Sequence, residues 1–405
     1  MEGSYDPLAR LRQHAAAREA EGLRRSLIPR PPQPTWLDLA SNDYLGLCGD
    51  PRLAEAAAQA ARTWGTGSTG SRLVTGTTAL HEELEADLAD FAGAASALVF
   101  SSGYLANLAT ISALAAAIAP ADPREGVLII SDEGNHASLI DGCRLAKRRG
   151  TRLQVTPHAD LTAVKRALRD RTEPAALVVT DAVFSVAGNM APVAELHALA
   201  REHGALLVVD EAHSFGVAGE GGRGVVHQAG LAAEPDLVRT VTLSKSLAGQ
   251  GGAVLGAPEV RQTLIDIGRG MIFDTGLAPP SVGAARAALG ILRDTPELPA
   301  MARQATRRLA AIAAGLGLVA TAPEAAVASV ILGDPQRAVA ARQTCTDHEV
   351  NVGCFRPPSV PVGGACLRLT GRASLGEIDF TRASRALAAV RDDSRIPEKS
   401  GGRAP

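Results

Sequence analysis

Lys245 and Asp210 are the strongest chemical signal in the sequence. Lys245 stands among small hydroxyl residues in Thr242–Leu247, and Asp210 closes the apolar run Ala205–Val209. A continuous apolar run that a charge closes is typical of a strand buried on both faces of a parallel sheet. The carboxyl end of such a strand points into the crevice where open α/β sheets bind ligands. A lysine there can form a Schiff base with an aldehyde, and the carboxylate can keep a pyridine nitrogen protonated, as pyridoxal 5'-phosphate (PLP) chemistry requires.

Each of these two residues has a simpler interpretation when it is taken alone. Lys245 could be a surface lysine that follows a strand, and Asp210 could cap the next helix. The pair favours PLP because the chemistry needs both groups and because a second segment indicates an anion site. Ser102-Gly103-Tyr104 separates a strand-like run from a helical pattern, so its backbone N–H groups can face a phosphate at the helix start. Thr242 and Ser244 could add hydroxyl donors to the same phosphate.

The order and spacing of further motifs resemble the α-oxoamine synthases, a family of PLP enzymes, over about residues 8 to 392. The matching segments are 41–47 (SNDYLGL), 65–76 (GTGSTGSRLVTG), 101–104 (SSGY), 135–139 (NHASL), 183–185 (VFS), the blocks around Asp210 and Lys245, 273–276 (FDTG) and 355–358 (FRPP). The resemblance implies the aspartate-aminotransferase fold (fold type I) and a homodimer. It also implies a decarboxylative condensation of L-alanine with a pimeloyl thioester, as in biotin biosynthesis, with coenzyme A or an acyl carrier protein as the carrier.

The resemblance implies roles around the cofactor. His136 stacks on the cofactor ring, Ser185 and His213 lie near its phenolic oxygen, and Thr275 reaches the site of the neighbouring subunit. The predicted catalytic residues are Lys245, His136, Asp210 and His213. The predicted cofactor-binding residues are Gly103, Tyr104, His136, Ser185, Asp210, His213, Thr242, Ser244, Lys245 and Thr275. Glu211 is predicted to be structural.

Five residues are predicted to bind the substrates by the same resemblance. Asn42 and Arg368 match the site for the amino-acid carboxylate, a task that suits the planar fork of arginine. The simpler interpretations are an Asx turn for Asn42 and a cross-strand ion pair for Arg368. Arg24, Arg356 and Ser359 match positions that face the acyl substrate.

The run Gly65–Gly70 (GTGSTG) matches the dinucleotide-binding fingerprint, but its surroundings do not. The fingerprint requires a preceding strand, whereas the alanine-rich segment Leu53–Ala61 predicts a helix. The resemblance instead implies a loop near the entrance of the active site, and a flexible loop without ligand contact is the alternative.

The bulk composition is that of a globular protein with room for two domains. The 405 residues are 46% apolar and 21% charged, and the net charge of −2 offers no electrostatic footprint for nucleic acid. Five scattered cysteines fit neither a disulfide framework nor a metal site, so we expect core thiols, no metal and a reducing cytoplasm. The N-terminal residues contain no apolar stretch of the kind found in signal peptides.

One uncharged stretch, residues 91–121, is long enough to suggest a membrane span. Glycines, serines and an asparagine interrupt it, so we expect the strand Ala97–Ser101, a turn and then a buried helix from about Tyr104. No membrane association is predicted.

Strand-like runs alternate with helical patterns between about residues 77 and 260, which predicts a mostly parallel α/β sheet. The resemblance implies that this sheet has seven strands. The expected strands are Ala97–Ser101, Val127–Ser131, Ala176–Asp181, Ala205–Asp210 and Leu237–Leu243, with Val327–Leu332 and Cys366–Thr370 in a smaller C-terminal α+β domain. The expected division is an N-terminal helix and arm (1–50), a large PLP-binding domain (51–290), the small domain (291–392) and a disordered tail (393–405).

Three alternatives remain open at this point. Another α-oxoamine synthase, such as a glycine C-acetyltransferase, would use the same residues, and an aminotransferase would use PLP with a 2-oxo acid. A PLP-binding regulator would need a DNA-binding module, and the sequence shows no basic helix-turn-helix segment.

Overall fold

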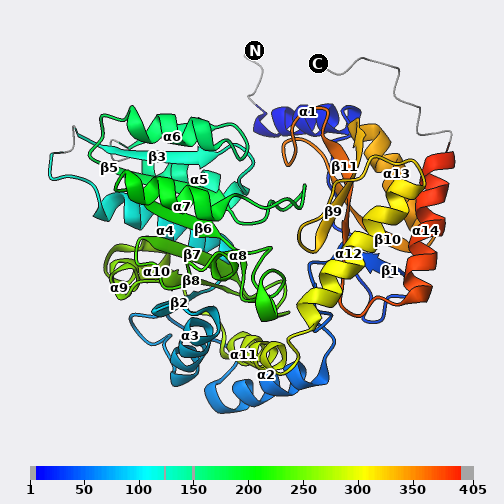
Figure 1. Ribbon diagram of the computed structural model, residues 1–405. Coiled ribbons are helices and arrows are strands. Elements are labelled where there is room, and N and C mark those ends of the chain that lie inside the picture. The colour runs from blue at the N-terminus through cyan, green and yellow to red at the C-terminus, as the bar shows by residue number, and fades with distance from the viewer. Residues whose placement is uncertain (1–5, 123–124, 148–150, 394–405) are drawn as a thin grey trace.

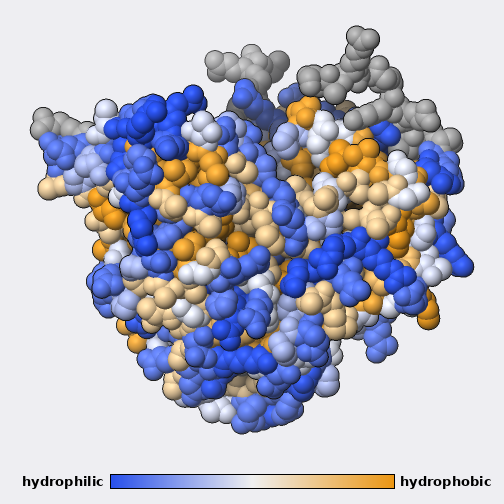
Figure 2. Space-filling view, viewed as in Figure 1, coloured by the Kyte–Doolittle hydropathy of each residue, from blue (hydrophilic) through white to orange (hydrophobic). Residues whose placement is uncertain are grey.

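A computed structural model of the chain describes residues 6–122, 125–147 and 151–393. Two parts lie side by side, a larger one on the left of Figure 1 and a smaller one on the right. Each part is built around its own sheet. Figure 2 shows the same face with strongly hydrophilic residues over helix α12 (Leu298–Gly315), which carries Arg303, Arg307 and Arg308.

The larger part contains a seven-stranded sheet with the order β2-β8-β7-β6-β5-β3-β4. Its strands are β2 (Ser96–Phe100), β3 (Val127–Asp132), β4 (Arg152–Thr156), β5 (Ala175–Asp181), β6 (Leu206–Asp210), β7 (Leu237–Thr242) and β8 (Gly252–Gly256). Only β8 runs antiparallel to its neighbours. The carboxyl ends of β3, β5, β6 and β7 therefore meet along one edge of the sheet.

Alternate residues of the strands bury themselves against helices on opposite faces of this sheet. In β3, Val127 and Ile129 pack toward α4 (Gly103–Ala117) and α5 (Ala137–Ala146), whereas Leu128 and Ile130 pack toward the other layer of helices. The remaining helices of this part are α2 (Pro51–Trp64), α3 (Ala79–Ala92), α6 (Leu161–Arg169), α7 (Val193–Glu202), α8 (Val225–Gln228), α9 (Pro258–Ile267), α10 (Arg269–Ile272) and α11 (Pro279–Asp294). Coverage of both faces explains why the strands read as continuous apolar runs.

The smaller part has a four-stranded sheet with the order β1-β10-β11-β9. Its strands are β1 (Leu37–Leu39), β9 (Val327–Gly333), β10 (Val350–Phe355) and β11 (Ala365–Thr370), and α12, α13 (Pro335–Asp347) and α14 (Glu377–Asp392) pack on it. Strand β1 belongs to the N-terminal arm and pairs in parallel with β10. Helix α1 (Pro7–Ala20) has no buried residue and lies at the top of the view.

The predicted fold class is confirmed, and all seven strands named from the sequence occur within one residue of their expected ends. The pattern did not identify β1, β4, β8 and β10. Strand β4 is half exposed at the sheet edge, β8 begins and ends with glycine, and β1 has three residues. None of these strands shows the long apolar run on which the prediction depended.

Other sequence-based expectations have mixed outcomes. The structure places β2 and α4 where the uncharged stretch predicted a strand and a helix, and no helix in the described ranges is long and apolar enough to cross a membrane. The expectation of core thiols is wrong for Cys48, which is exposed in the turn before α2. The boundaries at residues 50, 290 and 392 stay a prediction, and residues 394–405 of the predicted tail lie outside the described ranges.

A buried ion pair, Glu211 with Arg239, anchors the segment that follows β6. The two side chains are 0% and 1% exposed, and Arg239 Nε donates to Glu211 Oε2 over 2.6 Å. Glu211 also accepts from Ser214 Oγ and the Val226 amide, while Arg239 donates to the carbonyls of Ala92 and Arg223. Every charge is thus satisfied, which agrees with the structural role expected for Glu211.

We expect Glu211→Gln to lower the free energy of unfolding by about 3–5 kcal/mol, because it leaves the Arg239 charge buried without its partner. Denaturant titration at constant pH measures the change. The exposed pair Arg308 with Glu377 provides the control, since Glu377→Gln should change stability little. Equal effects of the two substitutions would contradict this account.

Candidate active site

Two buried aspartates lie side by side at the carboxyl edge of the large sheet. Asp181 ends β5 and Asp210 ends β6, and the two are register partners with exposed fractions of 1% and 4%. Burial and the neighbouring Asp210 carboxylate raise the pKa of Asp181 well above its usual value. Asp181 Oδ2 accepts a hydrogen bond from the His136 amide over 2.6 Å, which fixes the start of α5 beside Asp210.

Asn107 of α4 connects Asp210 to His136 through a chain of hydrogen bonds. Its amide nitrogen donates to Asp210 Oδ2 over 2.7 Å and to Ser138 Oγ over 2.8 Å, and its oxygen accepts from Thr240 Oγ1. Ser138 Oγ lies 2.7 Å from His136 Nδ1, and because it already accepts from Asn107, its proton is available to His136. Burial, the largest cause, lowers the pKa of His136, so the ring is neutral with its proton on Nε2.

Lys245 stands in a tight turn three residues beyond β7. The Ala248 amide donates to the Lys245 carbonyl over 2.9 Å, and Ala248 adopts a positive φ of 48°, which an alanine rarely adopts. Burial lowers the pKa of Lys245, while Asp210 and Asp181 act in the opposite direction. A half-buried amine with a lowered pKa, close to two carboxylates, suits both Schiff-base formation and proton transfer.

His213 is buried and bonded to a buried tyrosine, Tyr44. The Tyr44 hydroxyl lies 2.6 Å from His213 Nδ1 and 3.1 Å from Asn42 Oδ1. The Asn42 oxygen can only accept, so the Tyr44 hydroxyl donates to it, and a neutral His213 with its proton on Nδ1 can donate to the hydroxyl in turn. Burial, reinforced by Lys245 and Arg368, lowers the pKa of His213 well below its usual value, so the ring is a neutral donor.

Arg368 of β11 brings the smaller part to the large sheet. Its guanidinium donates to Asn42 Oδ1 over 2.9 Å and to the Ser185 carbonyl over 3.1 Å, and its plane lies over the Phe355 ring. Its Nε is buried and has no hydrogen-bond partner among the described residues. Asn42 and Arg368 are thus brought together as predicted, and no carboxylate pairs with Arg368 within the described ranges, so the cross-strand ion pair is not found.

The turn at Gly103 and Tyr104 opens α4, and its first N–H groups have no partner within the helix. Ser102 caps the helix by accepting from the Leu105 amide. A Cβ on Gly252 of β8 would lie 2.5 Å from the Gly103 nitrogen, so only glycine permits this close approach. Thr242 lies against Gly103, and the exposed Ser244 donates to the Gly251 carbonyl.

The predicted acyl-binding residues lie together at the end of α1, away from the Asn107 network. Arg356 donates to the carbonyls of Gly22 and Arg24, and Ser359 accepts from Arg25. The Arg24 side chain pairs with Glu19 over 2.7 Å and is exposed. The arrangement joins the N-terminal arm to the segment between β10 and β11.

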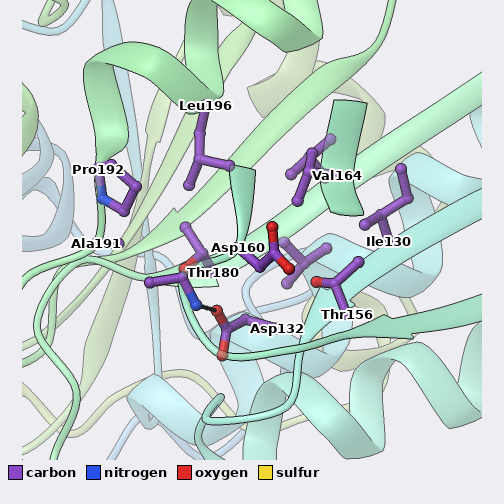
Figure 3. A pocket seen from close by; sticks show the side chains of 12 residues that line it. Ile130, Asp132, Thr156, Asp160, Val164, Thr180, Ala191, Pro192 and Leu196 are labelled. Atoms are coloured by element: carbon purple, nitrogen blue, oxygen red, sulfur yellow. Dashed lines mark hydrogen bonds between the residues drawn. The ribbon is translucent and has the colours of Figure 1, made fainter. Parts of the chain in front are cut away.

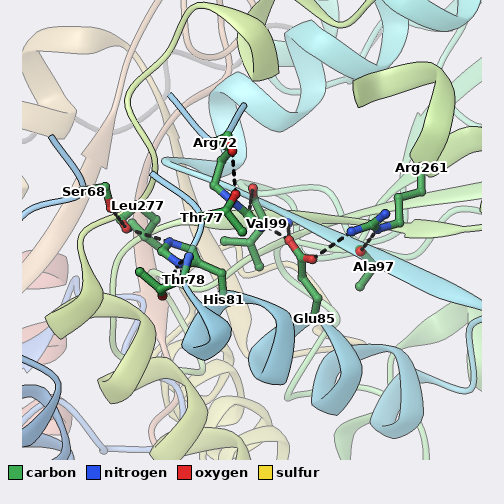
Figure 4. Close-up of polar contacts among 10 residues, drawn as sticks. All are labelled: Ser68, Arg72, Thr77, Thr78, His81, Glu85, Ala97, Val99, Arg261 and Leu277. Atoms are coloured by element: carbon green, nitrogen blue, oxygen red, sulfur yellow. Dashed lines mark hydrogen bonds and ion pairs between the residues drawn. The ribbon is translucent and has the colours of Figure 1, made fainter. Parts of the chain in front are cut away.

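The glycine-rich run 65–76 follows helix α2 rather than a strand, as expected, and it lies beside Thr275. Ser71 and Thr275 form an antiparallel bridge, and the Gly276 amide donates to the Gly70 carbonyl. Figure 4 shows how this loop is anchored: Arg72 donates to Glu85 over 2.8 Å, and His81 bonds the Leu277 carbonyl. Thr275 is exposed beside this loop.

A cavity between the sheet and helices α6 and α7 is unrelated to these groups. Asp132, Thr156, Asp160 and Thr180 contribute its polar lining (Figure 3), and none of the predicted site residues lines it.

The groups present fit PLP. An amine, a carboxylate, a neutral imidazole and a helix amino end occur at one sheet edge, as PLP requires. Asn107, Asp181 and Tyr44 were not predicted from the sequence as site residues. Asp181 closes an apolar run as Asp210 does, and Asn107 is a lone amide in an apolar helical pattern, so both signals were available.

Three comparisons with known proteins agree on the class of this chain. The model of the family described as aminotransferase class I and II matches residues 34–387. An 8-amino-7-oxononanoate synthase from Mycolicibacterium paratuberculosis is 54% identical over 384 residues, which are 95% of this chain and 97% of the relative.

Solved structures give the same picture. A serine palmitoyltransferase from S. paucimobilis with bound PLP–myriocin has a TM-score of 0.85 at 29% identity, over 95% of this chain and 98% of its own. An 8-amino-7-oxononanoate synthase from Francisella tularensis has a TM-score of 0.73 at 25% identity, over 88% of this chain and 97% of its own.

We expect the stability of the protein to fall as the pH drops below about 6.5, the usual pKa of histidine. The unfolded chain then binds a proton at His213 that the folded chain excludes, which costs up to about 1.4 kcal/mol per pH unit. Denaturant unfolding at several pH values gives the free energy of unfolding as a function of pH, and this free energy should depend less steeply on pH in His213→Gln than in the wild type. Replacing the exposed His14 in the same way is the control, and an unchanged slope in the His213 variant would contradict the assignment.

Proposed function

The chain belongs to the class I and II aminotransferase family and, within it, to the PLP-dependent α-oxoamine synthases, and we propose that it condenses L-alanine with a pimeloyl thioester to give 8-amino-7-oxononanoate. The observation that carries the choice of substrates is the 54% identity with an 8-amino-7-oxononanoate synthase across nearly the whole of both chains. The reaction forms a bond between Cα of alanine and the acyl carbon, and it breaks the C–S bond and the bond to the alanine carboxylate. Carbon dioxide and the free thiol carrier are released, and the product enters biotin biosynthesis.

Arg368 and Asn42 hold the alanine carboxylate in this proposal. The buried Arg368 Nε without a described partner and the adjacent terminal nitrogens form a fork that matches a carboxylate. Because Arg368 comes from the smaller part and Ser185 from the larger, substrate binding would tighten the contact between the two parts. A buried charge with no carboxylate partner among the described residues favours a ligand over a structural ion pair.

Lys245 acts as the general base. PLP, when bound, supplies an aldehyde carbon for amines and a ring that withdraws electrons from Cα. The Lys245 amine removes the Cα proton, and its lowered pKa keeps part of it neutral for that task. Asp210 holds a proton on the ring nitrogen, fixed by its bonds to Asn107 and the Ala212 amide. His136 would stack on the ring, and His213 and Ser185 would lie near its phenolic oxygen.

The amino end of α4 holds the phosphate, with Gly103 and Tyr104 offering amides and Thr242 and Ser244 hydroxyls. The acyl chain is placed along Arg24, Arg356 and Ser359, where a cation can meet its far carboxylate. We place the enzyme in the cytoplasm as a homodimer, in which Thr275 reaches the partner's phosphate. The exposed Leu73, Val74 and Phe273 near Thr275 support such an interface.

We expect the wild type to prefer L-alanine with a pimeloyl thioester over glycine with acetyl-CoA. A methyl group is worth only about 1–3 kcal/mol in an apolar pocket, so glycine should react slowly rather than be excluded. Release of CO₂ and amino ketone, measured as kcat/KM for both pairs and for pimeloyl-CoA against a pimeloyl carrier protein, decides the substrates. Lys245→Ala should lose at least about a hundredfold, and Arg24→Ala should weaken only the pimeloyl substrate.

A better rate with glycine and acetyl-CoA would replace the proposal by a glycine C-acetyltransferase. If the pimeloyl preference stands and Arg24→Ala leaves it unchanged, the function stands and the placement of the acyl chain is wrong.

The two neighbouring aspartates should respond differently to the same substitution. Asp210→Asn should lower kcat by at least about a hundredfold, because an amide cannot hold a positive charge on the ring. Asp181→Asn should stay within about tenfold of wild type, because an amide oxygen still accepts from His136 and a raised pKa already favours the uncharged form. Single-turnover kinetics with L-alanine measure both, and equal losses would show that Asp181 must be ionised.

A further inference from the structure

His158 joins two loops that carry predicted cofactor contacts. The first, residues 132–136, runs from the end of β3 to His136 and is called here the His136 loop. The second, residues 182–191, contains Ser185 and follows β5, and is called here the Ser185 loop. His158 follows β4 at the edge of the sheet and belongs to neither loop.

Toward the His136 loop, His158 bonds the carboxylate of Asp132. Its Nδ1 lies 3.0 Å from Asp132 Oδ1, which also accepts from the Gly134 amide over 2.7 Å. Asp132 Oδ2 accepts from the Ala159 amide over 2.6 Å. The His158 amide in turn donates to Glu133 Oε1. Asn135 ties the same loop to β5, so His136 is held from both sides.

Toward the Ser185 loop, His158 makes two different contacts. Its ring meets the Phe184 ring edge to face, with centroids 4.2 Å apart. Its Nε2 lies 2.9 Å from the Asn189 amide nitrogen, so Nε2 accepts and the ring proton is on Nδ1, where it donates to Asp132. Phe184 precedes Ser185, and the Phe184 and Asn189 backbones bond each other. One imidazole thus contacts both loops.

The backbone next to His158 is strained in the conformation that allows these contacts. Ala159 has a positive φ of 52°, which brings its amide to Asp132. A Cβ on Gly134 would lie 2.7 Å from His158 Nδ1, so a larger residue there would displace the ring. The side chain of His158 is nevertheless 37% exposed, so its removal should cost little global stability. The strain therefore serves local geometry.

We propose that His158 is a positioning residue that fixes the His136 loop and the Ser185 loop relative to each other, so that His136 and Ser185 meet the same cofactor at a set spacing. The inference rests on the proposed placement of those two residues beside PLP. A displacement of about 1 Å can cost on the order of a hundredfold in rate, so a contact outside the pocket can act on catalysis.

The test compares His158→Ala with wild type, both as PLP-loaded enzyme. The visible circular dichroism of bound PLP should change, and kcat/KM for L-alanine should fall about tenfold, while the thermal midpoint stays close to wild type. His158→Asn, whose amide can still donate to Asp132, should recover part of both signals. His197→Ala is the matched control, because it breaks another histidine–aspartate pair, with Asp236, at the amino end of β7. It should lower the thermal midpoint and leave the spectrum and kcat/KM unchanged.

Wild-type dichroism and kinetics in His158→Ala would overturn the inference, and so would equal changes in His197→Ala. If His158→Ala yields no loaded enzyme, Phe184→Leu and Asn189→Ala each remove one contact, and an unchanged spectrum in both has the same meaning. An unchanged spectrum in His136→Asn would remove the premise that His136 lies beside PLP. The dichroism needs no acyl substrate, so a wild type inactive with pimeloyl thioesters would overturn the proposed function alone.

Discussion

Two carboxylates one strand apart in the interior impose the main constraint on this structure. Asp181 and Asp210 stand in register at the ends of β5 and β6, with almost no exposure to solvent. Like charges at that spacing repel strongly in a medium of low dielectric constant, so both cannot be left without compensation. Asp210 accepts hydrogen bonds from the Asn107 side chain and the Ala212 amide, and Asp181 accepts one from the His136 amide. The raised pKa of Asp181 reduces the repulsion, and both carboxylates favour the charged form of Lys245 in the turn after β7.

This compensation also organises the surrounding elements. Asn107 can serve Asp210 only because α4 begins at the Gly103 turn, and that turn requires the glycine of β8 that passes it. His136 can serve Asp181 only because Asn135 anchors its loop to β5. Groups placed to satisfy a buried charge are therefore the same groups that shape the cofactor site, and their rigidity follows from the cost of an unpaired charge.

The buried strands and Asp210 could be predicted from local patterns in the sequence, whereas the long-range contacts of the site could not. Apolar runs closed by charge predicted the strands and located Asp210, because burial on both faces dictates composition. The strands β1, β4 and β8 lack that signal, because β1 has only three residues, β4 is largely unburied at the sheet edge, and the apolar run of β8 is only three residues long between glycines. The contact of Arg368 with Asn42 joins residues 326 positions apart and came from resemblance to a family, not from any local pattern. In the sequence, Asn107 is one polar residue in an apolar helical pattern, and only its contact with Asp210 in the folded protein shows its role.

The pairing of β1 with β10 ties the order of synthesis to the order of folding. Leu37 pairs with Val350, so β1 must wait for a partner that is synthesised 313 residues later. The large sheet closes through contacts between nearer segments and can form first, whereas the smaller sheet must close a loop that spans most of the chain. Until β1 pairs with β10, the N-terminal arm and the edge of β10 both lack their hydrogen-bonding partners. In a growing chain, the large sheet would therefore be complete before Arg368 of β11 is in place. The protein would bind its substrate only after the last strands of the smaller sheet have formed.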